Sequence, residues 1–101
     1  MTVDLTPRTK EVVAHLFNPA TAPLVEQLLM DECGDNLPLY KPTTPEGLER
    51  VRLAVLKISD GDQDKLVEAI LLAKRDWRDV LVWGGFANDL EAHIQWAKDL
   101  K

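Results

Sequence analysis

Hydrophobic positions recur at intervals of three and four residues along most of the chain, and short polar or proline-containing stretches separate the runs. This spacing places apolar side chains on one face of an α-helix. No run alternates apolar and polar residues in the way that indicates a β-strand. The pattern therefore predicts an all-α fold, a compact antiparallel helical bundle of five to six short helices.

Three helices are predicted in the first sixty residues, and each begins at a threonine with a proline close behind it. A threonine side chain accepts a hydrogen bond from a free amide of the first turn, and proline fits the first helical positions. The expected N-caps are Thr6, Thr21 and Thr44. Gly34 stands where a left-handed residue would end the second helix, residues 22–33. The third helix is apolar over more than half its circumference, which predicts a central position.

The second half of the chain predicts three more helices. Residues 59–62 form a turn that supplies an N-cap for the fourth, and Asp76 caps a short fifth helix, residues 77–84. Gly85 is expected to be left-handed, with Phe86 following in the arrangement of a Schellman motif. Asn88, with glutamate three residues later, predicts the start of the last helix.

Length and composition are those of one globular unit. The chain has 101 residues, 46% of them hydrophobic and 29% charged, so we expect a single helical domain over residues 1–101. The longest stretch without a charged or strongly polar residue, Val80 to Ala87, is far shorter than the roughly 20 residues of a membrane span. Neither a signal peptide nor a cofactor motif is evident, and the one cysteine, Cys33, has no partner for a disulfide. A cytoplasmic location is the simplest expectation.

The charge pattern disfavours nucleic acid as a partner. The chain carries a net charge of −5, and phosphate binding requires clustered lysine and arginine. Arg50 and Lys57 share a face of the third helix, but glutamates dilute this basic stripe. A helix-turn-helix protein that presents these two residues with Arg75 and Arg78 remains an alternative hypothesis.

A metal site or an active site is the second alternative. Asp60, Asp62 and Asp64 alternate as in the first part of a calcium loop, but the later ligands of such a loop are missing. A solvated turn that caps a helix is the simpler interpretation. Ser59 lacks a glycine-flanked elbow, and catalysis is not expected.

Aromatic residues gather in the last third of the chain, where His93 lies within the apolar arc of the last helix. Trp77 falls on the core line of the fourth helix, and Trp83 points about 120° away from it on a helical wheel. A partly exposed tryptophan is a typical anchor of a binding surface. We therefore predict a partner-binding patch of Trp83, Phe86, Trp96 and His93.

These observations predict a small intracellular protein-protein interaction or regulatory domain. Its partner would be another protein or a second copy of the chain, as in a homodimer. The apolar surface of the third and fourth helices exceeds what a two-layer bundle buries, which favours a partner. The metal or enzyme hypothesis, built on the turn with Asp60, Asp62 and Asp64 or on His93, stays open beside it.

Overall fold

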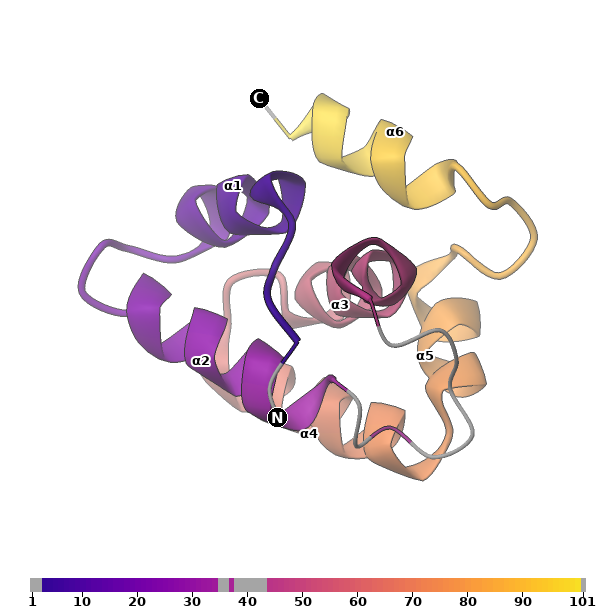
Figure 1. Cartoon of the computed structure of the whole chain (residues 1–101), viewed down its shortest axis with the longest axis horizontal. Helices are drawn as coiled ribbons and strands as arrows, with labels where there is room; N and C mark the ends of the chain where they lie inside the picture. The colour runs from indigo at the N-terminus through magenta and orange to yellow at the C-terminus, as the bar shows by residue number, and fades with distance from the viewer. Residues whose placement is uncertain (1–2, 35–36, 38–43, 101) are drawn as a thin grey trace.

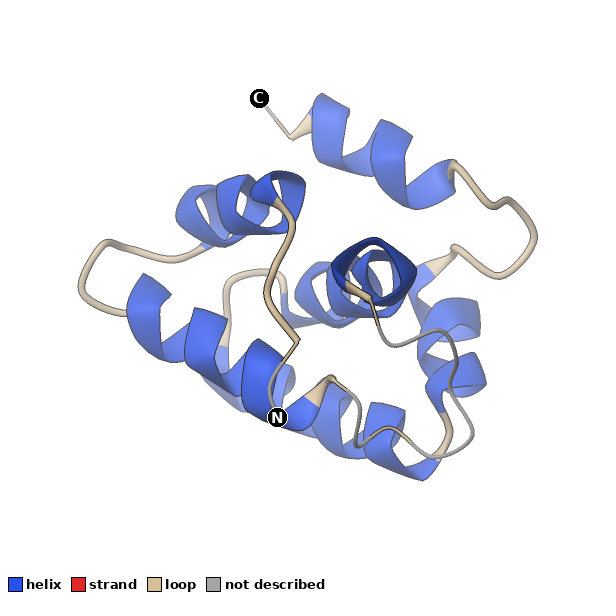
Figure 2. Cartoon of the chain, viewed as in Figure 1, coloured by secondary structure: helices blue, strands red, loops and turns tan. Residues whose placement is uncertain are grey.

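The computed structural model describes residues 3–34, 37 and 44–100, and the described part is all-α, as predicted. It contains six α-helices and no strand within those residues (Figures 1 and 2). The helices are α1 Pro7–Leu16, α2 Ala22–Glu32, α3 Pro45–Ser59, α4 Gln63–Arg75, α5 Trp77–Gly84 and α6 Ala92–Asp99. No helix within these residues is long and apolar enough to cross a membrane.

Helix α3 forms the centre of the molecule. In Figure 1 it is seen almost end-on, with the other helices arranged around it. It packs most extensively on α4 and α5, and also on α1 and α6. Its buried apolar residues face several directions: Leu48, Val51, Leu53, Ala54, Val55 and Leu56. The apolar surface of this helix thus corresponds to its central position, as the sequence predicted.

Most of the predicted helix starts are confirmed by side-chain caps. Thr6 Oγ1 accepts a hydrogen bond from the Thr9 amide at 3.2 Å, and Thr44 Oγ1 accepts one from the Gly47 amide at 3.0 Å. Asp62 and Asp76 cap α4 and α5 in the same way. Each cap satisfies an amide that the helix itself leaves without a partner.

The end of α5 is a Schellman motif, as predicted. Gly85 is left-handed, with φ of 84°, and the Phe86 amide donates to the Leu81 carbonyl at 2.8 Å. The Gly85 amide donates to the carbonyl of Val82 at 3.2 Å. These two bonds satisfy carbonyls of the last turn and direct Phe86 back toward the core.

Helix α2 begins after Thr21 and ends close to Gly34, as predicted, but the predicted side-chain cap at Thr21 and the left-handed Gly34 are wrong. Thr21 precedes α2, but its side chain makes no capping hydrogen bond; instead Asn18 Oδ1 accepts from the Thr21 amide at 2.9 Å. Gly34 is not among the residues with positive φ, and α2 ends at a cap residue, Cys33, with φ of −121°. A Cβ atom at Gly34 would lie 2.9 Å from the Met30 carbonyl oxygen, so close packing, not a left-handed turn, requires glycine there.

The predicted start of the last helix is also wrong. Helix α6 begins at Ala92 with Glu91 as its N-cap residue, four residues beyond Asn88. The Asp89 side chain accepts a hydrogen bond from the Glu91 amide at 2.8 Å, which forms a separate turn before the helix. Leu90 therefore lies outside the helix and is 75% exposed.

A buried arginine fastens the N-terminal segment to the core. Arg52 of α3 is fully buried, and its guanidinium donates to the carbonyl oxygens of Cys33, Asp4 and Val3 at 2.9, 2.5 and 2.6 Å. Burial lowers the pKa of Arg52 because it disfavours the charged form. Three backbone carbonyl oxygens therefore stabilise the buried guanidinium. Their hydrogen bonds link the N-terminal segment and the end of α2 to α3.

Candidate functional site

Large apolar side chains remain exposed on the outer side of α4 and α5. Trp83 of α5 is 59% exposed and Leu71 of α4 is 60% exposed. Val67, one helical turn before Leu71, is also exposed and lies on the same face. Such residues are usually buried in a domain core or at an interface, so their grouping marks a candidate binding surface.

Trp83 and Leu71 border one open hollow between α4 and α5. Its volume is about 610 Å³. The lining residues are Glu68, Leu71, Leu72, Lys74, Arg75 and Trp83. We call this set the Trp83 surface. Because the two helices contact each other, the surface is held on a packed framework and not on a loop.

Of the two basic residues at the Trp83 surface, one forms an ion pair within the described part of the chain and the other does not. Lys74 forms an ion pair with Glu32 of α2 at 2.5 Å. Arg75 is exposed and makes no ion pair with any residue in the described part of the chain. Arg78 of α5, which does not belong to this surface, is held by Asp76 in a two-point contact at 3.0 Å; this contact lowers the pKa of Asp76 and raises that of Arg78.

The other aromatic residues of the predicted patch face inward. Phe86 is 1% exposed, and its ring lies 5.9 Å from the Trp96 ring and 6.2 Å from the His93 ring, measured between centroids. Lys57 Nζ lies over the Phe86 ring, 5.0 Å from its centroid. Trp96 is half-buried. Of the four predicted residues, Trp83 presents the most surface to a partner, and Phe86 and His93 present almost none.

His93 belongs to a buried polar cluster that joins three helices. Its Nε2 atom lies 3.3 Å from Oε2 of Glu49, which is itself buried on α3. Glu49 also accepts hydrogen bonds from Thr6 at 2.6 Å and from Arg8 at 3.1 Å. The His93 Nδ1 atom is buried without a partner in the described residues. Burial lowers the pKa of His93, although Glu49 opposes this shift.

The sequence reading missed Glu49 and Arg52 as buried polar groups. The two residues stand three positions apart on α3, which has more buried residues than any other helix in the described part of the chain, and therefore on one face. Charged residues spaced like this within an apolar helix were the available signal. Their partners come from α1, α6 and the N-terminal segment, which no local pattern in the sequence connects to α3.

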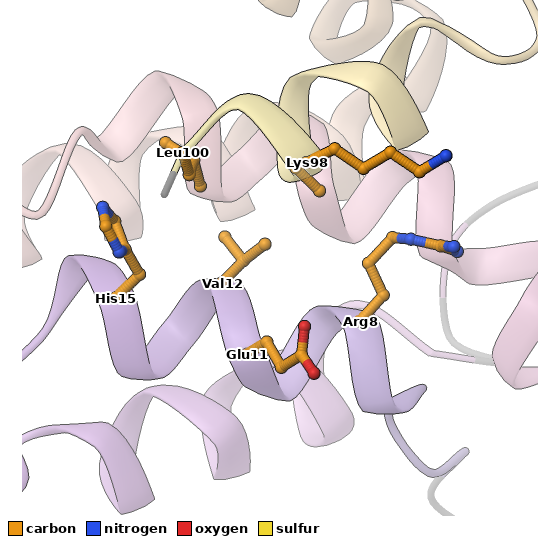
Figure 3. A pocket seen from close by; sticks show the side chains of 7 residues that line it. Arg8, Glu11, Val12, His15, Lys98 and Leu100 are labelled. Atoms are coloured by element: carbon orange, nitrogen blue, oxygen red, sulfur yellow. The ribbon is translucent and has the colours of Figure 1, made fainter.

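A second hollow lies between α1 and the end of α6, and Figure 3 shows its side chains. Its volume is about 350 Å³. The lining residues are Arg8, Glu11, Val12, His15, Ala97, Lys98 and Leu100. His15 is exposed.

The acidic turn between α3 and α4 has a structural role. Asp60 is the left-handed residue that ends α3, and Asp62 Oδ1 accepts hydrogen bonds from two amides of the first turn of α4. Asp64 is exposed in that first turn. In residues 3–34, 37 and 44–100, no three histidine, cysteine or acidic side chains converge as a metal site would require.

Ser59, which was considered for nucleophilic catalysis, and the thiol of Cys33 are both inaccessible. The Ser59 hydroxyl donates to the Leu56 carbonyl at 2.6 Å and is buried. Cys33 is fully buried, and burial raises the pKa of its thiol to about 12. Neither side chain is positioned to react with a substrate.

The basic stripe of α3 is engaged within the fold. Arg50 donates to the carbonyl oxygens of Phe86 and Ala87, and Lys57 lies over the Phe86 ring. Both side chains hold the turn after α5. This engagement weakens the helix-turn-helix hypothesis, which needs these cations to contact phosphates.

Comparisons with models of known protein families, with curated protein sequences and with solved structures find no match to this chain. The interpretation of the site therefore depends on its residues and geometry alone.

Proposed function

We propose that this chain is a protein-protein interaction domain and that the Trp83 surface binds its partner. The observation that carries the proposal is the pairing of two exposed anchors, Trp83 at 59% and Leu71 at 60%, around one hollow. Tryptophan is enriched among the residues that dominate binding energy, and leucine supplies additional apolar contact. A cytoplasmic location, expected from the single cysteine, forms part of this proposal.

The energetics of burial support a binding role for these two residues. Covering a large apolar side chain contributes roughly 1.5–3 kcal/mol. Trp83 and Leu71 both belong to packed helices, so a partner would not have to order the backbone that carries them. A surface that is already arranged in the free protein loses less free energy to ordering on binding.

The charge at the rim indicates the chemistry of the partner. Arg75 stands beside the two anchors without an ion pair in the described part of the chain, whereas the whole chain is acidic, with a net charge of −5. An apolar side chain that fills the hollow, followed by an acidic residue near Arg75, would complement this surface. An amphipathic helix of another protein combines these features.

Association can be tested by comparing Trp83→Ala and Leu71→Ala with Leu24→Ala. Leu24 is 54% exposed on α2, so its replacement removes similar apolar surface away from the Trp83 surface. We expect the immobilised wild-type chain and the Leu24→Ala variant to retain the same protein from a cell extract. The Trp83→Ala and Leu71→Ala variants should not retain it. Titration of that purified protein should then show loss of binding with Trp83→Ala and weaker binding with Arg75→Gln.

Self-association is the other outcome of this test. Light scattering during size-exclusion chromatography would show a dimer that Trp83→Ala converts to a monomer, while Leu24→Ala remains dimeric. If all variants behave like the wild type in both assays, the Trp83 surface does not bind a protein. Circular dichroism on each variant excludes unfolding as the cause of any loss.

A further inference from the structure

The hollow between α1 and α6 has an arrangement of charge unlike that of the chain as a whole. Its lining contains Arg8 and Lys98, with His15 as a third nitrogen base, against a single acid, Glu11. In Figure 3 the side chains of Arg8 and Lys98 extend toward the same end of the hollow, one from each helix. An otherwise acidic chain therefore has two cations at one end of a hollow.

Hydrogen-bonding capacity remains at this cationic end. Arg8 uses Nη1 for its contacts with Glu49, and its other N–H groups have no partner among the described residues. Lys98 makes no hydrogen bond or ion pair with any residue that the structure describes. The contacts with Glu49 use only Nη1 of Arg8, whose side chain is 38% exposed, so an anion could bind the other N–H groups without breaking this ion pair.

The middle of the hollow is apolar. Val12 and Leu100 lie between the cationic end and His15 in Figure 3, and Ala97 completes the apolar lining. The volume of about 350 Å³ falls at the small end of the range for ligand sites, which is roughly 300–1,000 Å³. This combination suits a compact ligand with an anionic head and an apolar tail.

We propose that the hollow between α1 and α6 binds a medium-chain alkyl carboxylate. Arg8 and Lys98 hold the carboxylate, and Val12, Ala97 and Leu100 contact the alkyl chain. The site lies on helices other than those of the Trp83 surface, so it does not depend on the proposed protein partner.

Octanoate is the probe for this site, with n-octylammonium and acetate as matched comparisons. In amide NMR spectra of the full chain, octanoate should shift signals around Arg8, Val12 and Ala97 and leave those around Leu71 and Trp83 unchanged. Acetate lacks the tail and should bind more weakly. Octylammonium carries the opposite charge and should not bind.

Variants of exposed residues separate specific from general binding. Lys98→Gln removes one cation and should weaken octanoate binding by about fivefold, and Glu11→Gln removes the opposing acid and should strengthen it. Lys10→Gln is the matched control, because Lys10 is exposed on α1 but does not line the hollow. Trp83→Ala should leave the affinity unchanged.

Three results would overturn the proposal. The first is equal binding of octanoate and octylammonium, which would indicate apolar adsorption without recognition of the head group. The second is an equal effect of Lys98→Gln and Lys10→Gln, which would indicate a response to net charge alone. The third is the absence of octanoate-induced shifts around α1 and α6.

Discussion

His93 of α6 lies with its Nε2 atom 3.3 Å from the Oε2 atom of Glu49 on α3, and both side chains are buried. This pair connects α6 to α3, the helix on which α6 mainly packs. The contact of Trp96 with the Phe86 ring also joins α6 to the core. The protonation state of His93 is therefore coupled to the attachment of the last helix.

We predict that stability falls as the pH decreases below about 6.5, the pKa of an unperturbed histidine. Burial lowers the pKa of His93 in the folded chain, so the unfolded chain takes up the proton first. The contribution of His93 to the free energy of unfolding is complete at pH values above its pKa in the unfolded chain. It is lost as the pH falls toward the lower pKa that His93 has in the folded chain. Urea denaturation of the wild type and His93→Gln at pH values on both sides of 6.5 measures this loss.

The free energy of unfolding of His93→Gln should depend less steeply on pH around 6.5 than that of the wild type, because glutamine does not titrate. Replacement of the exposed His15 by glutamine provides the control and should leave the wild-type slope intact. Parallel slopes for the wild type and His93→Gln would show that His93 does not cause the acid sensitivity.

Arg52→Met should lower the free energy of unfolding by about 3 kcal/mol, because one buried and two partly buried acceptors lose their donor and an unsatisfied buried acceptor costs roughly 1–3 kcal/mol. Arg52 serves three carbonyl oxygens, and methionine keeps an unbranched, shorter side chain without any donor. Denaturant unfolding gives the magnitude, and amide hydrogen exchange should increase near Val3 and Asp4. Arg75→Met, at an exposed site, should change stability by less than about 0.5 kcal/mol.

Trp83→Ala and Phe86→Ala should differ sharply in their effect on folding. Phe86 is 1% exposed and its truncation leaves a cavity, which predicts a loss of about 3–5 kcal/mol. Trp83 is 59% exposed, so its truncation should cost less than about 1 kcal/mol. Thermal melts followed by circular dichroism distinguish the two variants. Similar losses of stability would show that Trp83 is a core residue.

The Cys33 thiol should resist modification in the folded protein. Burial raises its pKa to about 12, so the reactive thiolate is scarce, and the surrounding core excludes reagents. An aromatic disulfide reagent near pH 8 should react slowly with the native chain and rapidly after addition of denaturant. Rapid reaction under native conditions would require frequent opening of the contact between α2 and the core.

Sequence alone determined the features that depend on neighbours in the chain. The caps at Thr6, Thr44 and Asp76 and the left-handed Gly85 were predicted correctly, because each hydrogen bond joins residues a few positions apart. The predicted cap at Asn88 was wrong because a competing local hydrogen bond forms instead. The Asp89 side chain forms a separate turn with Glu91, and the helix begins later.

The tertiary structure decided which side chains are buried and which remain available. Trp83 and Phe86 stand three positions apart in one apolar run, yet the turn after α5 sends Phe86 into the core and leaves Trp83 outside. Glu49 and Arg52 were equally hidden from sequence analysis, because the atoms that satisfy their charges come from distant segments. Local hydrogen bonds can be predicted from spacing, whereas burial depends on how all the helices pack together.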